Sequence, residues 1–351
     1  MRTCTVPNEV SCTQTPAPLV SPATQTRALT EVMSSHLFTT ALCKPRVSVV
    51  IPVRNGKDYL QEALDSVLQQ SFTDLELLLI NDGSTDDDYD RYALPDARIR
   101  VIHLTGTGVS RARNVGMAQS RGELIAFLDA DDVWFPGKLE AQVRYFDAHP
   151  DVGVVFGKFI RWTDLPGGGF APASSLIQDV AQLTKTEEER SGWLYTRLLD
   201  GLLVGMNTAV VRRSVYEAIG GFNEAMRLGE DYDFWLKASR VAEMHSLDGP
   251  VALYRIHGAS AMHRLSPQNH LANLLKSASM RWGLSTLGGQ RLSPASFDQR
   301  IGTVHFNHGY SHYWHGDRTV ARAAFYEALR RGHRPLRCVT YIALSFWTGH
   351  A

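Results

Sequence analysis

Apolar runs and amphipathic segments alternate along the chain from Arg46 onward. Aliphatic runs ended by polar or turn-forming residues predict strands, and apolar residues at helical spacing predict helices. The predicted strands are Val47–Pro52, Leu75–Ile80, Ile99–His103, Leu124–Leu128 and Val152–Phe156. The predicted helices between them are Lys57–Gln70, Ser110–Gln119 and Lys138–Ala148. This alternation indicates βαβ units, and therefore an α/β fold with a mainly parallel sheet sandwiched by helices.

The pattern is looser beyond residue 157. The Gly- and Pro-rich segment Leu165–Ala173 predicts a loop. A strand, two helices and a hairpin-like pair of strands are predicted at Asn207–Arg212, Ser214–Ile219, Glu230–Ala242, and Met244–Leu247 with Val251–Ile256. From about residue 267 the pattern is helical, and the small and large residues between Gly309 and Ala328 alternate as in a tetratricopeptide-type helical hairpin.

These patterns divide the chain into three regions. Residues 1–44 are rich in Thr, Ser, Pro and Gln, so we expect a disordered leader, with a short helix near Leu29–Met33. No apolar core follows a basic start, so no secretory signal is visible there. Residues 45–262 are expected to form the α/β domain and residues 263–351 an all-helical C-terminal appendage.

Composition excludes several classes of protein. The chain has 351 residues, of which 44% are hydrophobic, and 36 basic residues balance 36 acidic ones. It is therefore neither a disordered tail, nor collagen-like, nor a disulfide scaffold, and the balanced charge argues against nucleic acid as a partner. No apolar run reaches the roughly 18 residues of a membrane span. The four cysteines, at positions 4, 12, 43 and 338, fit a reduced cytoplasmic setting.

Two polar clusters follow predicted strands. Asp129-Ala130-Asp131 comes directly after Leu124–Leu128, and two carboxylates at this spacing can share a divalent cation with substrate phosphates. The alternative is a solvated acidic turn. In the turn Asn81–Asp86, Asp82 can accept a hydrogen bond from a nucleotide base, but an Asx-turn explains this composition equally well. Parallel sheets bind ligands at the carboxyl ends of their strands, where both clusters lie.

A series of motifs in fixed order closely resembles glycosyltransferase family 2, the inverting enzymes with the GT-A fold. It spans about residues 46–260. Its members are Val47–Asn55, Asn81–Asp86, Ala112–Gly116, Phe127–Asp132, Gly220–Glu224, Gly229–Asp233 and the segment Tyr254-Arg255-x-His257. Asn81 departs from the family pattern, since many relatives carry a second Asp there.

The resemblance implies roles for ten residues. Those expected to bind the nucleotide are Pro52, Val53, Asn55, Asp82, Arg113 and Asp129. Those expected to hold Mg²⁺ or Mn²⁺ on the diphosphate are Asp129, Asp131 and His257. Asp231 is expected to be the general base that deprotonates the acceptor hydroxyl, and Glu230 to orient Asp231 or the acceptor. Trp235 is either a platform for the acceptor or a core aromatic residue. Met206-Asn207 lies where the acceptor-side loop of the family often falls, so a direct role with the acceptor is one interpretation of that segment.

The function that these observations favour is metal-dependent, inverting sugar transfer. The expected donor is a nucleotide sugar, a UDP-sugar in particular, and the expected acceptor is a hydroxyl of a glycan, a lipid-linked sugar or another molecule in polysaccharide biosynthesis at the cell envelope. One alternative is a nucleotidylyltransferase acting on a sugar phosphate, although Arg54-Asn55-Gly56-Lys57 matches its phosphate loop only in part. Another is a non-catalytic scaffold that binds sugar nucleotides; the intact acidic motifs argue against it.

The charges are unevenly distributed. Residues 291–337 hold eight arginines against three acidic residues, and the apolar run Val339–Trp347 follows them. Either these helices form a solvated pair, or they contact an anionic membrane peripherally, at its inner face in a cytoplasmic protein. The spacing of His305, His308, His312 and His315 permits a metal site, with ordinary helix packing as the alternative.

Overall fold

The computed structural model describes residues 44–165, 167–258 and 265–346. By their contacts, the described residues from Pro45 onward group together as one compact unit. The leader and the helix predicted near Leu29–Met33 lie outside the described residues. The domain boundary at residue 262 remains a prediction.

One eight-stranded mixed sheet, in the order β3-β2-β1-β4-β7-β6-β8-β5, forms the centre of this unit. Its strands are β1 Val47–Val53, β2 Leu75–Asp82, β3 Ile99–Leu104, β4 Leu124–Phe127, β5 Val133–Trp134, β6 Val152–Thr163, β7 Val210–Arg212 and β8 Glu243–Ile256. β1 to β4 pair in parallel, as do β6 and β8, whereas β7 and β5 are antiparallel to their neighbours. The predicted mainly parallel α/β sheet is therefore confirmed, with antiparallel pairs in its second half.

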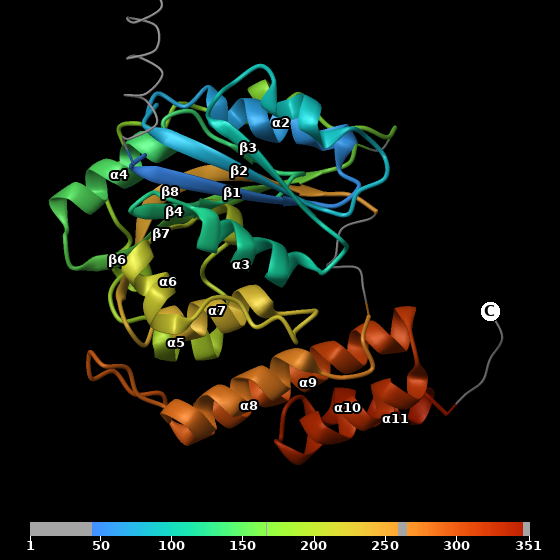
Figure 1. The fold of residues 1–351 in the computed structure, drawn as a ribbon. Coiled ribbons are helices and arrows are strands. Elements are labelled where there is room, and N and C mark those ends of the chain that lie inside the picture. The colour runs from blue at the N-terminus through green and yellow to red at the C-terminus, as the bar shows by residue number, and fades with distance from the viewer. Residues whose placement is uncertain (1–43, 166, 259–264, 347–351) are drawn as a thin grey trace, which may run out of the picture. The chain divides into compact units, whose positions relative to one another are not determined.

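Helices cover both faces of the sheet (Figure 1). They are α2 Lys57–Leu68, α3 Val109–Gln119, α4 Lys138–Ala148, α5 Tyr195–Asp200, α6 Arg213–Ile219, α7 Glu230–Ala238, α8 His270–Trp282, α9 Pro294–His315, α10 Arg318–Arg330 and α11 Pro335–Leu344. Short 3₁₀ segments occur at Tyr89–Ala93, Ala173–Ser175, Glu188–Arg190 and Met206–Thr208. α2 and α4 pack on one face; α3, α5, α6 and α7 pack on the other.

Alternation along β1 explains why both faces are apolar. Val49 and Ile51 belong to the core under α2, and Val50 belongs to the core on the opposite face. A strand buried on both sides has few polar positions until it ends, so its polar residues gather in the loop that follows. α3 lies very close to this strand, because a Cβ on Gly116 would be 2.4 Å from Cγ1 of Val50.

The structure corrects one predicted element and adjusts others. The hairpin predicted from Met244 to Ile256 is wrong, because β8 is one continuous strand that pairs in parallel with β6. The Gly and Pro residues that suggested a turn lie where the register between the two strands shifts. α7 ends at Ala238, four residues earlier than expected. β5 and α5 are too short to leave a periodic pattern in the sequence.

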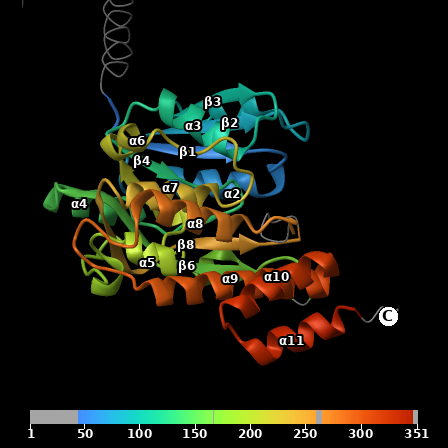
Figure 2. The ribbon, with the colours of Figure 1, turned by 90° about the horizontal axis from the view of Figure 1, so that it is seen from below.

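The predicted C-terminal helices are confirmed. α8 and α9 lie side by side, with α10 and α11 beyond α9 (Figure 2). Their residues Leu275 and Ile301 join the core that lies under α3 and α7. The α9–α10 pair is close-packed at Gly309, where a Cβ would lie 3.1 Å from the carbonyl oxygen of Ala321. Among the described residues, none of the helices combines the length and hydropathy that a membrane-spanning segment requires.

Candidate active site

The acidic turn after β4 is anchored at its last residue, Asp132. This carboxylate is buried and accepts hydrogen bonds from the backbone N–H of Arg255, at 2.8 Å, and from Nδ2 of Asn207, at 2.7 Å. Burial, together with the charges of Asp131 and Asp129, raises the pKa of Asp132 well above its ordinary value. The turn is therefore tied to β8 on one side and to the segment before β7 on the other.

Arg255, at the end of β8, holds the same turn through its side chain. Its Nε donates to the carbonyl oxygen of Asp131 at 2.7 Å, and its guanidinium forms an ion pair with Glu62 of α2. The guanidinium carbon lies 3.8 to 4.8 Å from the ring centroids of Trp162, Phe170 and Tyr59. An arginine stacked on several rings has little freedom to move, so the Asp131 backbone has a fixed position.

Asp131 and His257 are in contact. Nε2 of His257 lies 3.0 Å from Oδ2 of Asp131. Burial and the neighbouring Asp129 raise the pKa of Asp131, although His257 opposes the shift. The turn thus concentrates negative charge at the end of β4.

These side chains suit a divalent cation shared with a ligand. Carboxylate oxygens are preferred ligands of both Mg²⁺ and Mn²⁺, and Mg²⁺ retains waters and takes further oxygens from substrate phosphates. Within the described residues, no three His, Cys, Asp or Glu side chains are already gathered as a ready-made metal cage. An ion bound here would need a ligand to supply part of its coordination.

Arg113 of α3 connects the two acidic segments. It is buried, and its guanidinium forms ion pairs with Oδ1 of Asp129 at 2.7 Å and with Oε1 of Glu230 at 3.1 Å. Burial alone would lower its pKa, but Asp129 and Glu230 outweigh this and raise it. One arginine therefore joins the end of β4 to the beginning of α7. Asn114, also on α3, fixes this helix in place. Its Nδ2 donates to the carbonyl oxygen of Phe222 at 3.0 Å, and its Oδ1 accepts the N–H of Phe222 at 2.8 Å.

Glu230 and Asp231 begin α7, directly after Gly229, whose φ of +79° suits glycine. Burial raises the pKa of Glu230, with Arg113 opposing. Burial also raises the pKa of Asp231; Arg113 opposes that shift as well. Oδ1 of Asp231 accepts the N–H of Tyr232 at 2.7 Å. A carboxylate whose pKa is raised has a stronger affinity for a proton than an ordinary aspartate, which suits a general base.

Asp82, at the end of β2, is engaged by the loop after β3. Its carboxylate accepts the N–H groups of Thr107 and Gly108 at 2.6 and 2.7 Å and the hydroxyl of Thr107 at 3.0 Å. Burial acts to raise its pKa, but these hydrogen bonds outweigh burial and lower it. Asp82 is thus an ionised residue that fixes this loop.

The end of β1 forms a third part of the same edge. Pro52 and Val53 are buried in the strand, and Asn55 has a φ of +52°. The backbone N–H of Asn55 donates to Oγ of Ser84 and its Oδ1 accepts the N–H of Thr85, both at 2.9 Å. The loops after β1 and β2 are therefore bonded to each other.

The structure brings five predicted residues into direct contact in two groups: Arg113 with Asp129 and Glu230, and Asp131 with His257. Asp231 follows Glu230 in the sequence. Within the described part of the chain, no hydrogen bond joins Asp82 or Asn55 to these carboxylates. Trp235 is fully buried, so it is a core aromatic residue, and Asn207 supports Asp132. No metal group forms around the histidines of α9 in the described residues.

Sequence reasoning missed Asp132, Arg255 and the rings around Arg255. Asp132 and Arg255 belong to the motifs that carry the family resemblance, so a signal existed. Trp162 lies near the end of β6 and Phe170 in the loop predicted at Leu165–Ala173, and only the fold places them beside Arg255.

Known proteins resemble this chain in sequence and in fold. Residues 48–172 match the sequence model of Glycosyl transferase family 2. An uncharacterized glycosyltransferase of Rickettsia felis is 30% identical over 239 residues, which are 67% of this chain and 38% of that protein. The uncharacterized glycosyltransferase EpsJ of Bacillus subtilis is 34% identical over 224 residues, which are 60% of this chain and 61% of that protein. The chain spans 38, 37 and 33% of the lengths of three Rickettsia relatives.

Two solved structures have the same fold. Residues 1–349 of S. aureus TarS in complex with UDP-GlcNAc superpose with a TM-score of 0.58 at 20% identity, covering 85% of this chain and 84% of that one. The mannosyltransferase PcManGT of Pyrobaculum calidifontis, in complex with GDP-Man and Mn²⁺, has a TM-score of 0.51 at 19% identity, covering 88% of this chain and 82% of that one. The fold is that of the GT-A glycosyltransferases. The chain belongs to glycosyltransferase family 2.

Proposed function

We propose that this protein is a metal-dependent, inverting glycosyltransferase that moves a sugar from a nucleoside diphosphate, UDP in particular, to an acceptor hydroxyl. The observation that carries the proposal is the Asp129–Arg113–Glu230 bridge. This bridge connects the acidic turn, which is suited to bind a cation, to the pair Glu230 and Asp231, which is suited to accept a proton. Sugar transfer needs both groups, one for the leaving diphosphate and one for the attacking hydroxyl.

Asp129, Asp131 and His257 are the residues that would hold the cation. When bound, Mg²⁺ or Mn²⁺ supplies positive charge to the diphosphate as it leaves. The raised pKa of Asp131 agrees with a site whose negative charge lacks a full counter-charge. PcManGT, a neighbour in fold, was solved with Mn²⁺ and GDP-Man, which supports the same kind of donor and cation here.

Asp231 is proposed as the general base. The acceptor oxygen bonds to the anomeric carbon while the bond from that carbon to the diphosphate oxygen breaks, and the hydroxyl proton passes to the Asp231 carboxylate. Attack opposite the leaving group inverts the anomeric centre. Glu230 is a positioning residue, because its Oε1 contacts Arg113, which in turn contacts Asp129.

Asp231→Asn tests this role. We expect transfer to fall by about 10²–10⁴-fold, the usual contribution of a general base, with donor affinity preserved. Asp233→Asn on the same helix is the matched control, since Asp233 pairs with Lys237 and has no proposed catalytic role. Equal transfer by the Asp231→Asn protein and the wild type would show that another group takes the proton.

Pro52, Val53, Asn55 and Asp82 are proposed to border the nucleotide. Asp82 is ionised and bonded to the loop at Thr107–Gly108, so it would shape this end of the pocket while offering its remaining lone pairs to a base N–H. The neighbour TarS was solved with UDP-GlcNAc, which supports UDP as the nucleotide.

The acceptor is proposed to be a glycan or a lipid-linked molecule of the cell envelope, handled by a cytoplasmic protein. The C-terminal helices would contact the inner face of the membrane peripherally. α11 exposes Leu336 and Val339 by 84% and 54%, and Phe346 beyond it by 64%. Arg334 and Arg337 are exposed beside them. Binding to anionic but not to neutral vesicles at low salt would support this contact, and failure to bind anionic vesicles would refute it.

Donor binding can be tested by thermal unfolding with a panel of nucleotide sugars. We expect one nucleotide sugar to raise the unfolding temperature with Mn²⁺ and much less with EDTA, because ligands of the folded state stabilise it. In the Asp131→Ala protein, the part of this rise in unfolding temperature that depends on Mn²⁺ should be lost. Asp151→Ala, at an exposed turn, is the control. A shift unaffected by Asp131→Ala would contradict the proposed cation site.

A further inference from the structure

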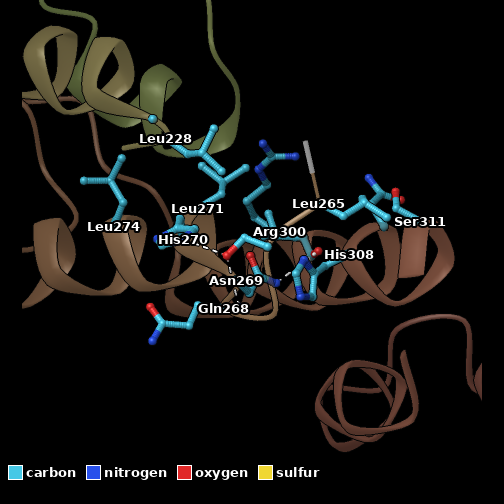
Figure 3. Close-up of a pocket in the computed structure, with 14 residues that line it drawn as sticks. Leu228, Leu265, Gln268, Asn269, His270, Leu271, Leu274, Arg300, His308 and Ser311 are labelled. Atoms are coloured by element: carbon cyan, nitrogen blue, oxygen red, sulfur yellow. Dashed lines mark hydrogen bonds between the residues drawn. The ribbon is translucent and has the colours of Figure 1, made fainter. Parts of the chain in front are cut away.

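A cavity lies beside Leu228–Gly229, the two residues that directly precede Glu230 and the proposed base Asp231. It measures about 350 Å³ and is bounded by Leu228–Gly229, by the segment Leu265–Leu274 including the start of α8, and by α9 (Figure 3). A volume of this size is typical of a site for a small molecule or for part of a larger one. Apart from Gly229 and His308, none of the residues that line it belongs to a motif discussed above.

The walls combine two kinds of chemistry. One part is apolar: Leu228, Leu265, Leu271, Leu274 and Val304. The other part carries cationic or hydrogen-bonding groups: Arg300, His270, His308, Asn269, Gln268, Asn307, Ser266 and Ser311. No Asp, Glu, Phe, Tyr or Trp is among the described residues that line it. A cavity without acids does not repel an anion, and one without these flat rings lacks the usual stacking platform for a sugar.

Two residues that line this cavity each carry a polar atom that is buried and has no hydrogen-bond partner in the described structure: Nε of Arg300 and Nε2 of His308. Buried polar atoms nearly always have a hydrogen-bond partner, and leaving one unsatisfied is costly. Figure 3 shows the guanidinium of Arg300 reaching from α9 toward Leu228. Both side chains can donate to an anion. Burial lowers the pKa of His308, which therefore donates as a neutral imidazole from the ring nitrogen that carries the proton.

The cavity and the proposed base share one turn of the chain. Leu228 and Gly229 line the cavity, and Glu230 and Asp231 follow directly as the first residues of α7. Arg300 also acts on Tyr232, the residue after Asp231: burial raises the pKa of its hydroxyl to about 12, and the arginine opposes this. A ligand in this cavity would therefore lie beside the residues that receive the acceptor.

We propose that this cavity binds a phosphate group and the adjoining carbons of an apolar chain, as the part of the acceptor that does not react. That this ligand is the acceptor rests on the proposed function, whereas the binding of an alkyl phosphate to the cavity does not. Arg300 is the main contact of the phosphate, with His308 as a second donor. Leu271 and Leu274 contact the chain.

Calorimetry on the full chain, without donor or metal, tests the proposal with hexyl phosphate, inorganic phosphate and 1-hexanol. We expect hexyl phosphate to bind tightest, inorganic phosphate more weakly, and 1-hexanol weakest. Arg300→Gln should weaken hexyl phosphate at least tenfold, and Arg300→Lys should weaken it less. Leu274→Ala should weaken hexyl phosphate and leave inorganic phosphate unchanged. Arg281→Gln, an exposed arginine on α8, should change nothing.

Each outcome supports or overturns one part of the proposal. Equal binding of hexyl phosphate and 1-hexanol, or equal binding by the wild type and Arg300→Gln, overturns the phosphate site. Equal binding of hexyl phosphate and inorganic phosphate overturns the chain site and points to free phosphate. If the Arg300→Gln protein unfolds at a lower temperature than the wild type, the Arg300→Lys and Leu274→Ala proteins test the site instead. Binding of hexyl phosphate by both with the affinity of the wild type would then overturn the proposal. Hexyl phosphate binding without any sugar transfer would support this cavity and overturn the proposed function; transfer without hexyl phosphate binding would do the reverse.

Discussion

Replacing Arg113 with methionine separates the two halves of the proposed site while keeping a long apolar side chain near Phe222. The guanidinium lies 5.4 Å from the ring of Phe222, so methionine can retain that packing. What is lost is the pair of charge-assisted bonds to Asp129 and Glu230. The Arg113→Met protein should therefore be less stable mainly through uncompensated charge.

Exposure sets the size of this loss. The side chains of Arg113 and Glu230 are only 5% and 13% exposed, whereas that of Asp129 is 31% exposed and can be partly solvated. Breaking a buried ion pair by removing one partner costs about 3–5 kcal/mol. Because water can solvate Asp129, we expect the free energy of unfolding to fall by an amount near the lower end of that range, mostly because Glu230 is left unpaired.

The loss should depend on pH. Burial already raises the pKa of Glu230 in the presence of Arg113, which opposes the shift, so its pKa should rise further without the arginine. A group whose pKa is raised by folding adds stability below its unfolded pKa and loses that contribution as the pH rises through the folded value. The difference between wild type and Arg113→Met should hence be largest at pH 8 and smaller at pH 5.

Urea unfolding at both pH values measures this difference. Arg111→Met is the matched control, since it lies on the same helix and pairs with Glu224 in an exposed setting, with 53% and 40% of the two side chains accessible. Exposed pairs contribute at most about 1 kcal/mol. If both variants lose the same free energy of unfolding, or if the loss in Arg113→Met does not change with pH, then Arg113 does not neutralise a buried Glu230.

Three further predictions concern the same framework. The rate of transfer, as kcat/KM, should fall as the pH falls through the pKa of Asp231, at a midpoint above the ordinary aspartate value of about 3.9, because burial raises it. A midpoint at or below the ordinary value would argue against Asp231 as the base. Gly116→Ala should lower the free energy of unfolding by about 1–3 kcal/mol, since the added Cβ would meet Val50 at 2.4 Å. A gain in stability, as helix propensity alone predicts, would contradict this close approach. Asn207→Ala should cost about 1–3 kcal/mol in urea unfolding and weaken Mn²⁺-dependent donor binding, because Asp132 loses a hydrogen bond. Unchanged Mn²⁺ dependence would show that the acidic turn keeps its shape without Asn207.

The first half of the fold could be predicted because its signals are local. β1 is a run of residues buried on both faces, and it ends where polar residues begin. β8 could not be predicted as one strand, because a bulge in its pairing with β6 accommodates the Gly and Pro that usually mark a turn. What decides that segment is its neighbour in the sheet, which the local sequence does not contain.

The candidate site also has a part that local sequence predicts and a part that depends on packing. The carboxylates of Asp129 and Asp131 stand out because they follow a buried strand. Arg113 was expected near the nucleotide, but whether it contacts phosphate or carboxylate depends on how close α3 and α7 lie, which is a property of packing. The cage of rings around Arg255 comes from three separate segments, so no single stretch of sequence reveals it.

The rate of nucleoside diphosphate release from UDP- and GDP-sugars tests the central proposal most directly. The protein should release the nucleotide from at least one donor in the presence of Mn²⁺, and both EDTA and the Asp131→Ala substitution should abolish this release. Release that continues at the same rate with EDTA or in the Asp131→Ala protein would contradict the proposal that the acidic turn after β4 holds the cation for a glycosyltransferase.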